Sequence, residues 1–183
     1  MDKVVFLEGE QIYLRGLVES DAEGPYWTWF NDAEVCRFNS HHVYPYPQAR
    51  AREFVHYAQH TQDALVLAII RKSDDQHVGN LALQEIHHIN RTADLGFLIG
   101  DKDAWGKGIG SEAGQLLIDH GFQALNLHRI TCGTTAENIP MRKLAERLGF
   151  TAEGTRRQAA YKNNRYVDII EYGLLRSEWE ARR

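Results

Sequence analysis

A glycine-rich turn constrains this 183-residue chain more than any other segment. Residues 105–110 read Trp-Gly-Lys-Gly-Ile-Gly and lie between a strand-like run and an apolar helical pattern. Glycine lets the backbone adopt positive φ and come close to a ligand. Successive N–H groups in such a turn point into one concavity at the positive end of the helix that follows. The turn therefore suits a pyrophosphate cradle, with a tight strand-to-helix turn that binds nothing as the alternative.

Two common phosphate-binding loops do not fit this turn. A P-loop requires Ser or Thr directly after Gly-Lys, but Lys107 is followed by Gly108. A dinucleotide fingerprint aligned on Gly106 and Gly108 requires a third glycine where Ser111 stands. It also requires an acidic residue about 20 positions further on, where the chain reads His-Arg-Ile. The sequence therefore argues against a P-loop protein and against a nicotinamide-dependent enzyme.

Composition predicts one ordinary globular domain spanning residues 1–183, with enough apolar sequence (43%) for a full core. The net charge of −4 offers no basic field for nucleic acid or anionic lipid, and no apolar run is long enough to cross a membrane. The first ten residues hold too short an apolar stretch for a secretory signal, so we expect a cytoplasmic protein. Cys36 and Cys132 belong to no CxxC pair and are expected to be buried free thiols.

Hydrophobic periodicity predicts an α+β (mixed α/β) fold with about seven strands. The expected strands are 10–17, 64–71, 78–86, 93–100, 129–135, 152–161 and 166–174. The expected helices are 25–30, one that starts at residue 47, 111–125 and 138–148. The strands between 64 and 100 suggest an antiparallel meander. The strand, glycine-rich turn, helix and strand that follow form a βαβ unit, which places a parallel pair in the sheet.

Local signals mark the ends of several elements. Ser20 with Glu23 is a capping-box pattern before the first helix. Asn138 is expected to cap the last predicted helix, and Gly149 is expected to end it. The final hairpin is expected to turn at the asparagine pair 163–164, because asparagine tolerates positive φ.

Several segments, in order along nearly the whole chain, resemble the GNAT superfamily of acetyl-CoA-dependent N-acetyltransferases. Residues 108–110 are similar to the end of its acyl-CoA motif, and further matches cover 79–80, 93–99 and 138–150. The segment 153–179 resembles the branch that contains the Rim-type ribosomal-protein alanine acetyltransferases and many acetyltransferases of amino sugars and antibiotics. The resemblance implies a twisted, mostly antiparallel sheet with flanking helices, in which the parallel pair in the middle splays open.

The resemblance also implies that acetyl-CoA is the co-substrate. The pantetheine arm would lie in the splay, hydrogen-bonded to the strand 93–99, and the pyrophosphate would rest on the glycine-rich turn. Asn138 would contact the arm, with a plain helix N-cap as the alternative and both roles compatible. The residues implied in acetyl-CoA binding are Phe97, Leu98, Ile99, Trp105, Gly106, Lys107, Gly108, Ile109, Gly110, Ser111 and Asn138.

Three positions depart from the family pattern. Trp105 replaces the usual Gln or Arg, which removes a side-chain contact but keeps the backbone cradle. Ala145 stands where many members have a Tyr that protonates the leaving thiolate, and Met141 stands where the Rim-like branch often has Ser. No side-chain general acid is evident, so water or the substrate is expected to protonate the thiolate.

The expected reaction is direct attack of a neutral amine on the acetyl thioester. At pH 7 an amine of pKa ~10.4 is only ~0.04% neutral, whereas an amine of pKa ~8 is about 10% neutral, so a weakly basic acceptor is favoured. Backbone N–H groups of residues 97–99 are expected to hold the thioester oxygen. Glu85 is the candidate base. The strand's parity is open from the sequence. In the alternative register Gln84 faces the site and Glu85 is a solvated residue at the strand edge.

A polar loop within residues 38–47 is expected to line the acceptor pocket. Asn39, His41, His42 and Tyr44 offer hydrogen-bonding groups for a polyhydroxylated acceptor, with an ordinary surface loop as the alternative. The nine histidines include no HExxH motif and no Cys/His spacing typical of zinc, so no metal site is predicted.

Three functions remain open on the sequence. The polar loop favours an N-acetyltransferase that acts on a small-molecule amine such as an amino sugar. The alternatives are a Rim-type protein N-terminal acetyltransferase and, because the family's Tyr and Ser are absent, a non-catalytic acyl-CoA-binding module. The expected partners are acetyl-CoA and an amine or a peptide N-terminus, without nucleic acid or membrane, in a monomer or homodimer.

Overall fold

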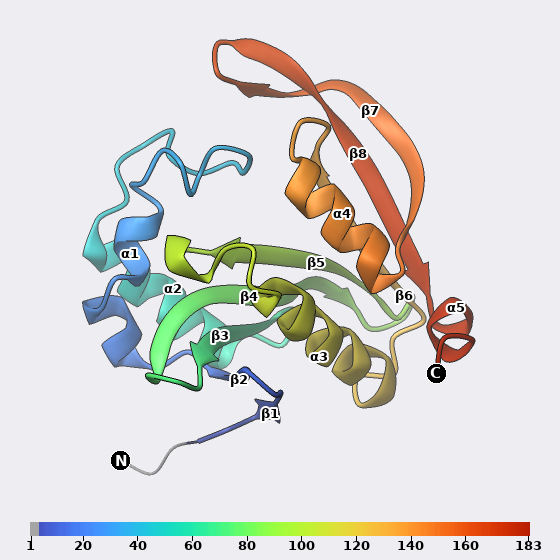
Figure 1. Ribbon diagram of the computed structural model, residues 1–183, viewed down its shortest axis with the longest axis horizontal. Helices are drawn as coiled ribbons and strands as arrows, with labels where there is room; N and C mark the ends of the chain where they lie inside the picture. Colours follow the sequence, from blue (N-terminus) through green and yellow to red (C-terminus); the bar gives the residue numbers. More distant parts are fainter. Residues whose placement is uncertain (1–3) are drawn as a thin grey trace.

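The computed structural model describes residues 4–183, so the first three residues of the stretch that was examined for a secretory signal lie outside it. Figure 1 shows one twisted sheet with helices on both faces. The strands are β1 (Leu7–Glu8), β2 (Ile12–Gly16), β3 (Leu65–Arg71), β4 (Gln76–His87), β5 (Thr92–Ile99), β6 (Arg129–Thr135), β7 (Thr151–Lys162) and β8 (Arg165–Leu175). The helices are η1 (Glu19–Glu23), α1 (Tyr26–Trp29), α2 (Gln48–His60), η2 (Lys102–Ala104), α3 (Ile109–Gln123), α4 (Ile139–Leu148) and α5 (Arg176–Glu180).

The eight strands form one mixed sheet in the order β1-β2-β3-β4-β5-β6-β8-β7. Every neighbouring pair is antiparallel except β5 and β6, which run parallel. The register between β5 and β6 extends only from Thr92–Arg129 to Asp94–Thr131, although β5 continues to Ile99. The two strands therefore part after Asp94, and the expected splayed parallel pair in the middle of the sheet is confirmed.

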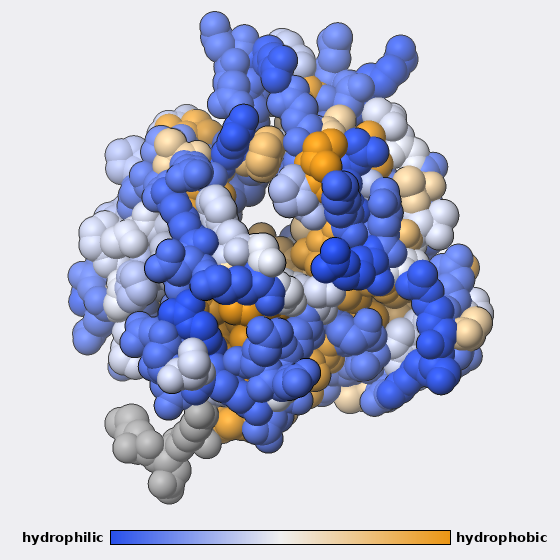
Figure 2. All heavy atoms as spheres, viewed as in Figure 1, coloured by the Kyte–Doolittle hydropathy of each residue, from blue (hydrophilic) through white to orange (hydrophobic). Residues whose placement is uncertain are grey.

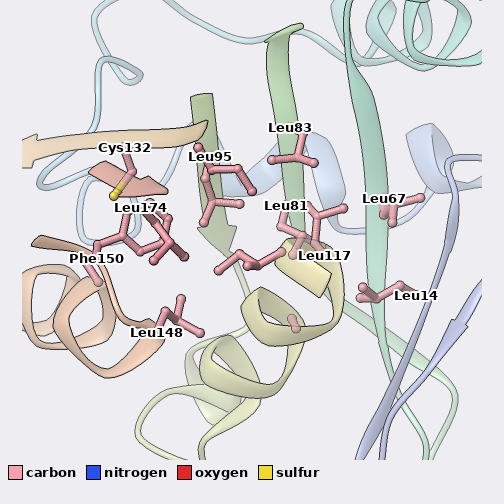
Figure 3. Packing of buried hydrophobic residues seen from close by; sticks show 14 of the residues in the cluster. Leu14, Leu67, Leu81, Leu83, Leu95, Leu117, Cys132, Leu148, Phe150 and Leu174 are labelled. Atoms are coloured by element: carbon pink, nitrogen blue, oxygen red, sulfur yellow. The ribbon is translucent and has the colours of Figure 1, made fainter. Parts of the chain in front are cut away.

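Two apolar clusters pack on opposite faces of the sheet, one under α3 and α4 and the other under α1 and α2. Figure 3 shows Leu81, Leu83 and Leu95 of β4 and β5 beside Leu117 of α3 and Leu148 of α4. We call this side the α3/α4 face and the other side the α1/α2 face. The buried residues of the α1/α2 face are Tyr13, Leu17, Ala22, Tyr26, Trp29, Phe30, Tyr46, Ala51, Val55, Val66, Ala68 and Ile70.

Gly114 allows α3 to lie close to the splay. A Cβ atom at this position would sit 2.7 Å from Leu148 Cδ1 and 2.8 Å from Phe97 Cζ, which is closer than real Cβ contacts. The absence of a side chain at Gly114 thus lets α3 touch both α4 and the outer half of β5. This packing fixes the start of α3, and with it the glycine-rich turn, beside the splayed strands.

The predicted elements are confirmed, with ends shifted by about two residues or fewer. Both central hairpin residues, Asn163 and Asn164, have positive φ (51° and 61°), and Gly149 ends α4 at φ 99°. The two cysteines are buried free thiols, as expected.

Several features differ from the sequence-based expectation, the unpredicted 3-10 helices η1 and η2 among them. The short β1 adds an eighth strand to the expected seven or so, and α5 was not predicted. The capping-box prediction for Ser20 and Glu23 is wrong, because both residues lie inside η1. The chain enters η1 through Val18, whose N–H donates to Asp21 Oδ2 at 2.8 Å. Asp21 takes this role because Arg15 holds its carboxylate through two hydrogen bonds of 2.7 Å.

Candidate functional site

The glycine-rich turn leaves an open stretch of backbone at the start of α3. Gly106 and Gly108 adopt φ of 72° and 83°, which side-chain-bearing residues rarely adopt, and Gly108 is the N-cap of α3. No atom lies within 4 Å of the place where a Cβ on Gly106 would sit, so this part of the turn is open. The N–H groups of Ile109 and Gly110 belong to the first turn of α3, where no preceding carbonyl can accept them. The turn thus has open backbone donors at the positive end of a 15-residue helix.

Trp105 ties this turn to the end of the splayed strand. Its indole Nε1 donates to the backbone oxygen of Ile99 at 2.9 Å, and the side chain remains 40% exposed. The residue that departs from the family pattern therefore has a structural role here. It holds the cradle against the outer end of β5.

The register of β5 shows which peptide groups face the splay. Gly100 N–H donates to Val78 O at 3.0 Å, and hydrogen-bonded and non-bonded pairs alternate along an antiparallel ladder. Leu98, which pairs with Asn80, therefore bonds to β4, whereas Phe97 and Ile99 direct their peptide groups towards β6. Since β6 has already diverged, these groups are placed to meet an extended ligand. The Leu98 side chain packs on the α1/α2 face.

The start of α4 borders the same opening. Asn138 caps the helix, because its Oδ1 accepts the Met141 N–H at 3.2 Å while its Nδ2 donates to Thr134 Oγ1 at 3.0 Å. Its predicted contact with acetyl-CoA stays a prediction. Ala145 is buried in the core, so this turn of α4 carries no hydroxyl there.

A carboxylate stands at the point where β5 and β6 part. Leu83 and Leu95 point into the α3/α4 face, so the alternating residues Gln84 and Asp94 lie on the α1/α2 face. Gln84 Nε2 donates to Asp94 Oδ2 at 3.2 Å, and Thr131 Oγ1 donates to Asp94 Oδ1 at 3.1 Å. Burial, and to a smaller extent the nearby carboxylates of Glu85 and Glu171, raise the pKa of Asp94 above its ordinary value. A raised pKa makes this carboxylate a stronger base than a solvated aspartate.

Glu85, the base predicted from the sequence, lies beside this position rather than at it. It occupies a bulge, where the register between β4 and β5 shifts between Gln84 and His87, and its φ is 53°. Its side chain is exposed. The structure thus places Gln84 against Asp94, the alternative that strand parity left open, and leaves Glu85 close enough to affect the pKa of Asp94.

The predicted acceptor loop connects α1 to α2 and does not bring its four polar residues to one point. Asn39 Oδ1 accepts the His41 N–H at 2.9 Å, and the His41 ring lies edge-on to Phe30, with 4.6 Å between centroids. Burial, together with the charges of Arg50 and Lys162, lowers the pKa of His41. His42 and Tyr44 are exposed, Tyr44 by 76%. Their predicted contacts with an acceptor stay predictions.

The β7–β8 hairpin meets this loop on the α1/α2 side. Lys162, at the end of β7, donates to the backbone oxygens of Cys36 (3.2 Å) and His41 (3.1 Å). Figure 2 shows an opening through the molecule, and in the matching view of Figure 1 it lies between the α1–α2 connection and α4. The splay is thus reached from two sides, one at the glycine-rich turn and one at this loop.

Metal and membrane features were also sought among residues 4–183. Within that range, no three His, Cys, Asp or Glu side chains are grouped so that they could hold a metal ion. None of the helices described there is long and apolar enough to span a bilayer.

Sequence reasoning missed three residues that the structure brings to this region. Asp94 and Thr131 meet across the last paired position of β5 and β6. Asp94 lies in the matched segment 93–99, but neither side chain was singled out from the sequence. Strand parity within 93–99 is the one signal that could have directed attention to Asp94. Lys162 reaches the loop across more than 120 residues of sequence, which no local pattern records.

Comparison with known proteins agrees with this geometry. The family model described as "Acetyltransferase (GNAT) domain" matches residues 11–151. An uncharacterized N-acetyltransferase p20 of Bacillus licheniformis is 32% identical over 176 residues, which cover 93% of this chain and 96% of the relative. The spermidine N-acetyltransferase of Vibrio cholerae, solved with CoA and spermine, superposes with a TM-score of 0.85 over 93% of this chain and 98% of its own, at 24% identity.

Two further relatives have named acceptors. The spermidine N(1)-acetyltransferase of Escherichia coli K12 is 27% identical over 68% of this chain and 67% of its own length. The ribosomal-protein-serine acetyltransferase of the same organism is 33% identical over 56% of each chain. The glycine turn, the splayed pair and the family match agree, and they fit acetyl-CoA as the co-substrate. This chain belongs to the GNAT family of N-acetyltransferases.

Proposed function

We propose that this chain transfers the acetyl group of acetyl-CoA directly to a primary amine of a small, positively charged molecule, such as a polyamine or an amino sugar. The observation that carries the proposal is the Asp94 carboxylate, which stands where β5 and β6 part and faces the α1/α2 side of the sheet. The cradle lies at the start of α3, which covers the other side. Acetyl-CoA lying in the splay would thus have backbone N–H donors to its pyrophosphate on the α3/α4 face and the Asp94 carboxylate as a base on the α1/α2 face.

Each step uses a group already described. Bound acetyl-CoA supplies an activated acetyl thioester. Asp94 accepts, directly or through one water, the proton that the amine loses as its nitrogen attacks the carbonyl carbon. The N–H groups of Phe97 and Ile99 face the splay and hold the carbonyl oxygen as negative charge develops on it. The C–S bond breaks and, because Ala145 offers no hydroxyl, a water protonates the departing CoA thiolate. The protonated Asp94 carboxyl returns its proton to that water, so the products are a neutral amide and the free CoA thiol.

Charge supports a cationic acceptor. Asp94 and Glu85 lie near each other, and among the described residues neither has an ion-pair partner. Glu171 contributes less, because Arg156 pairs with it at 2.5 Å. Two carboxylates that no cationic side chain in the described part of the chain neutralises attract a molecule that carries an ammonium group besides the amine to be acetylated. The relative that acts on spermidine supports the same class.

A protein N-terminus is the second candidate. It is favoured by the relative that acts on a ribosomal protein, and a basic peptide would also be drawn to the carboxylates. The contact of Lys162 with the α1–α2 loop argues for the smaller acceptor, because it closes the route that a folded protein would need.

A thiol-release assay with acetyl-CoA separates these possibilities. The acceptors are spermidine, glucosamine, an aminoglycoside and peptides with free N-termini, each at several concentrations. We expect turnover on at least one small amine, with a higher kcat/KM than on any peptide. Turnover on peptides alone would replace the first candidate with the second. Tight acetyl-CoA binding without turnover on any acceptor would contradict both and leave an acyl-CoA-binding module.

A further inference from the structure

The tip of the β7–β8 hairpin extends beyond the rest of the sheet. The pairing of β6 with β8 ends at Thr135–Ile169, while the pairing of β7 with β8 continues to Lys162–Arg165. The turn itself is held by the Tyr161 hydroxyl, which donates to Asn164 Oδ1 at 2.7 Å. The hairpin thus carries Lys162 away from the sheet and presents it to another part of the chain.

Two separate sets of hydrogen bonds hold the α1–α2 loop, one where the loop begins and ends and one in its middle. At its base, Asn31 Oδ1 accepts the Tyr46 N–H and Asn31 Nδ2 donates to the Tyr46 oxygen, both at 2.8 Å. Near its start, Lys102 pairs with Asp32 and Glu34, which attaches the loop to η2. The apex is held by Lys162, whose ammonium donates to the oxygens of Cys36 and His41.

The partners of Lys162 are unusual for a half-buried ammonium. Both are neutral carbonyl oxygens, and within residues 4–183 no carboxylate forms an ion pair with Lys162. Two carbonyls hold an ammonium less tightly than a carboxylate would, because charge-assisted bonds between opposite charges are the strong ones. The contact therefore joins the hairpin to the loop through two hydrogen bonds and, among the residues described, no ion pair.

We propose that Lys162 is a specificity-determining residue that closes the acceptor channel over the α1/α2 face and limits it to small amines. This inference rests on the proposed function. The two hydrogen bonds join the loop that borders the opening (Figure 2) to the hairpin, whose tip lies at the top of the view in Figure 1. Lys162 acts through the loop that it holds and does not touch the reacting atoms.

The test compares Lys162→Met with Lys72→Met. Lys72 serves as the control, because its ammonium also donates to a backbone oxygen, that of Gly9 at 2.7 Å, but at the β1–β2 end of the sheet, where it also pairs with Glu8. The probes are spermidine, glucosamine and an eight-residue peptide with a free N-terminus. For Lys162→Met we expect the KM of the best small amine to rise about tenfold, kcat to stay within about twofold, and the ratio of peptide to small-amine turnover to increase. Acetyl-CoA affinity should not change. Lys72→Met should leave all of these values unchanged.

Two further measurements keep the inference testable. Lys162→Arg, which can still donate to two carbonyls, should restore most of the small-amine KM. If Lys162→Met does not fold, Lys162→Gln replaces it, and the backbone amides of residues 36–41 should exchange with solvent faster in that variant than in the wild type. An unchanged KM and size preference in the folded variant would overturn the inference, and so would unchanged amide exchange. A wild-type enzyme that acetylates only peptides would instead reject the proposed function.

Discussion

Replacing Asp94 with Asn tests the base at the splay. The change keeps the size of the side chain and one acceptor oxygen for Thr131, but it removes the basic carboxylate. General-base catalysis contributes typically 10²–10⁴-fold, or about 3–5 kcal/mol of transition-state stabilisation. Water can reach the half-buried side chain and partly replace it, so we expect the lower end, about a 100-fold loss of kcat. Acetyl-CoA affinity should be unchanged, because the cradle lies on the other face.

The pH dependence of kcat/KM separates Asp94 from Glu85. Burial and neighbouring carboxylates raise the pKa of Asp94, so activity should fall, as pH is lowered, at a higher pH than a solvated aspartate would give. Glu85→Gln removes one of those carboxylates and therefore lowers the pKa of Asp94. In this variant the acid limb should move to lower pH while the plateau rate is kept.

The assay is thiol release with the best amine of the panel, measured from acidic to mildly alkaline pH. Full kcat and an unchanged acid limb in Asp94→Asn would refute the assignment. Loss of the plateau in Glu85→Gln, with acetyl-CoA affinity intact, would return the role of base to Glu85. Thr131→Val serves as a control, since it removes a donor to Asp94 and should move the acid limb to higher pH.

Three other changes test the surrounding structure. Gly108→Ala places a side chain at φ 83° and should weaken acetyl-CoA binding about tenfold in titration calorimetry. Trp105→Phe removes the donor to Ile99 O and should raise the acetyl-CoA Kd a few-fold, with kcat kept. Asp21→Ala leaves Arg15 unpaired and should cost about 3 kcal/mol in urea unfolding. Hydrogen bonds from Arg15 and His77 hold the pKa of Asp21 well below its usual range. The wild type should therefore lose this stabilisation only as pH falls below about 4.

Sequence patterns located the elements well because each pattern has a local cause. Strand alternation, the Asn138 cap and the asparagine pair at 163–164 depend on residues a few positions apart, and each is found as expected. The Ser20–Glu23 prediction failed for a non-local reason, since Arg15 and His77 position Asp21 as the group that receives the chain entering η1.

The candidate site also has one part that local sequence patterns predict and one part that depends on non-local contacts. The cradle was visible in the sequence, because positive φ at Gly106 and Gly108 and the following helix are local properties. The acceptor side was not. Which of Gln84 and Glu85 faces the splay depends on a bulge in β4, and the sequence does not show where a strand gains an extra residue.

The sequence by itself thus determined the family, the glycine-rich turn and the order of strands and helices, since these are set by nearest neighbours along the chain. Only the tertiary structure decided that Asp94 stands where the parallel strands part and that Lys162 holds the α1–α2 loop. The physical reason is that both roles arise from pairing register and from contacts between segments far apart in sequence. The free energy of such contacts depends on the whole fold.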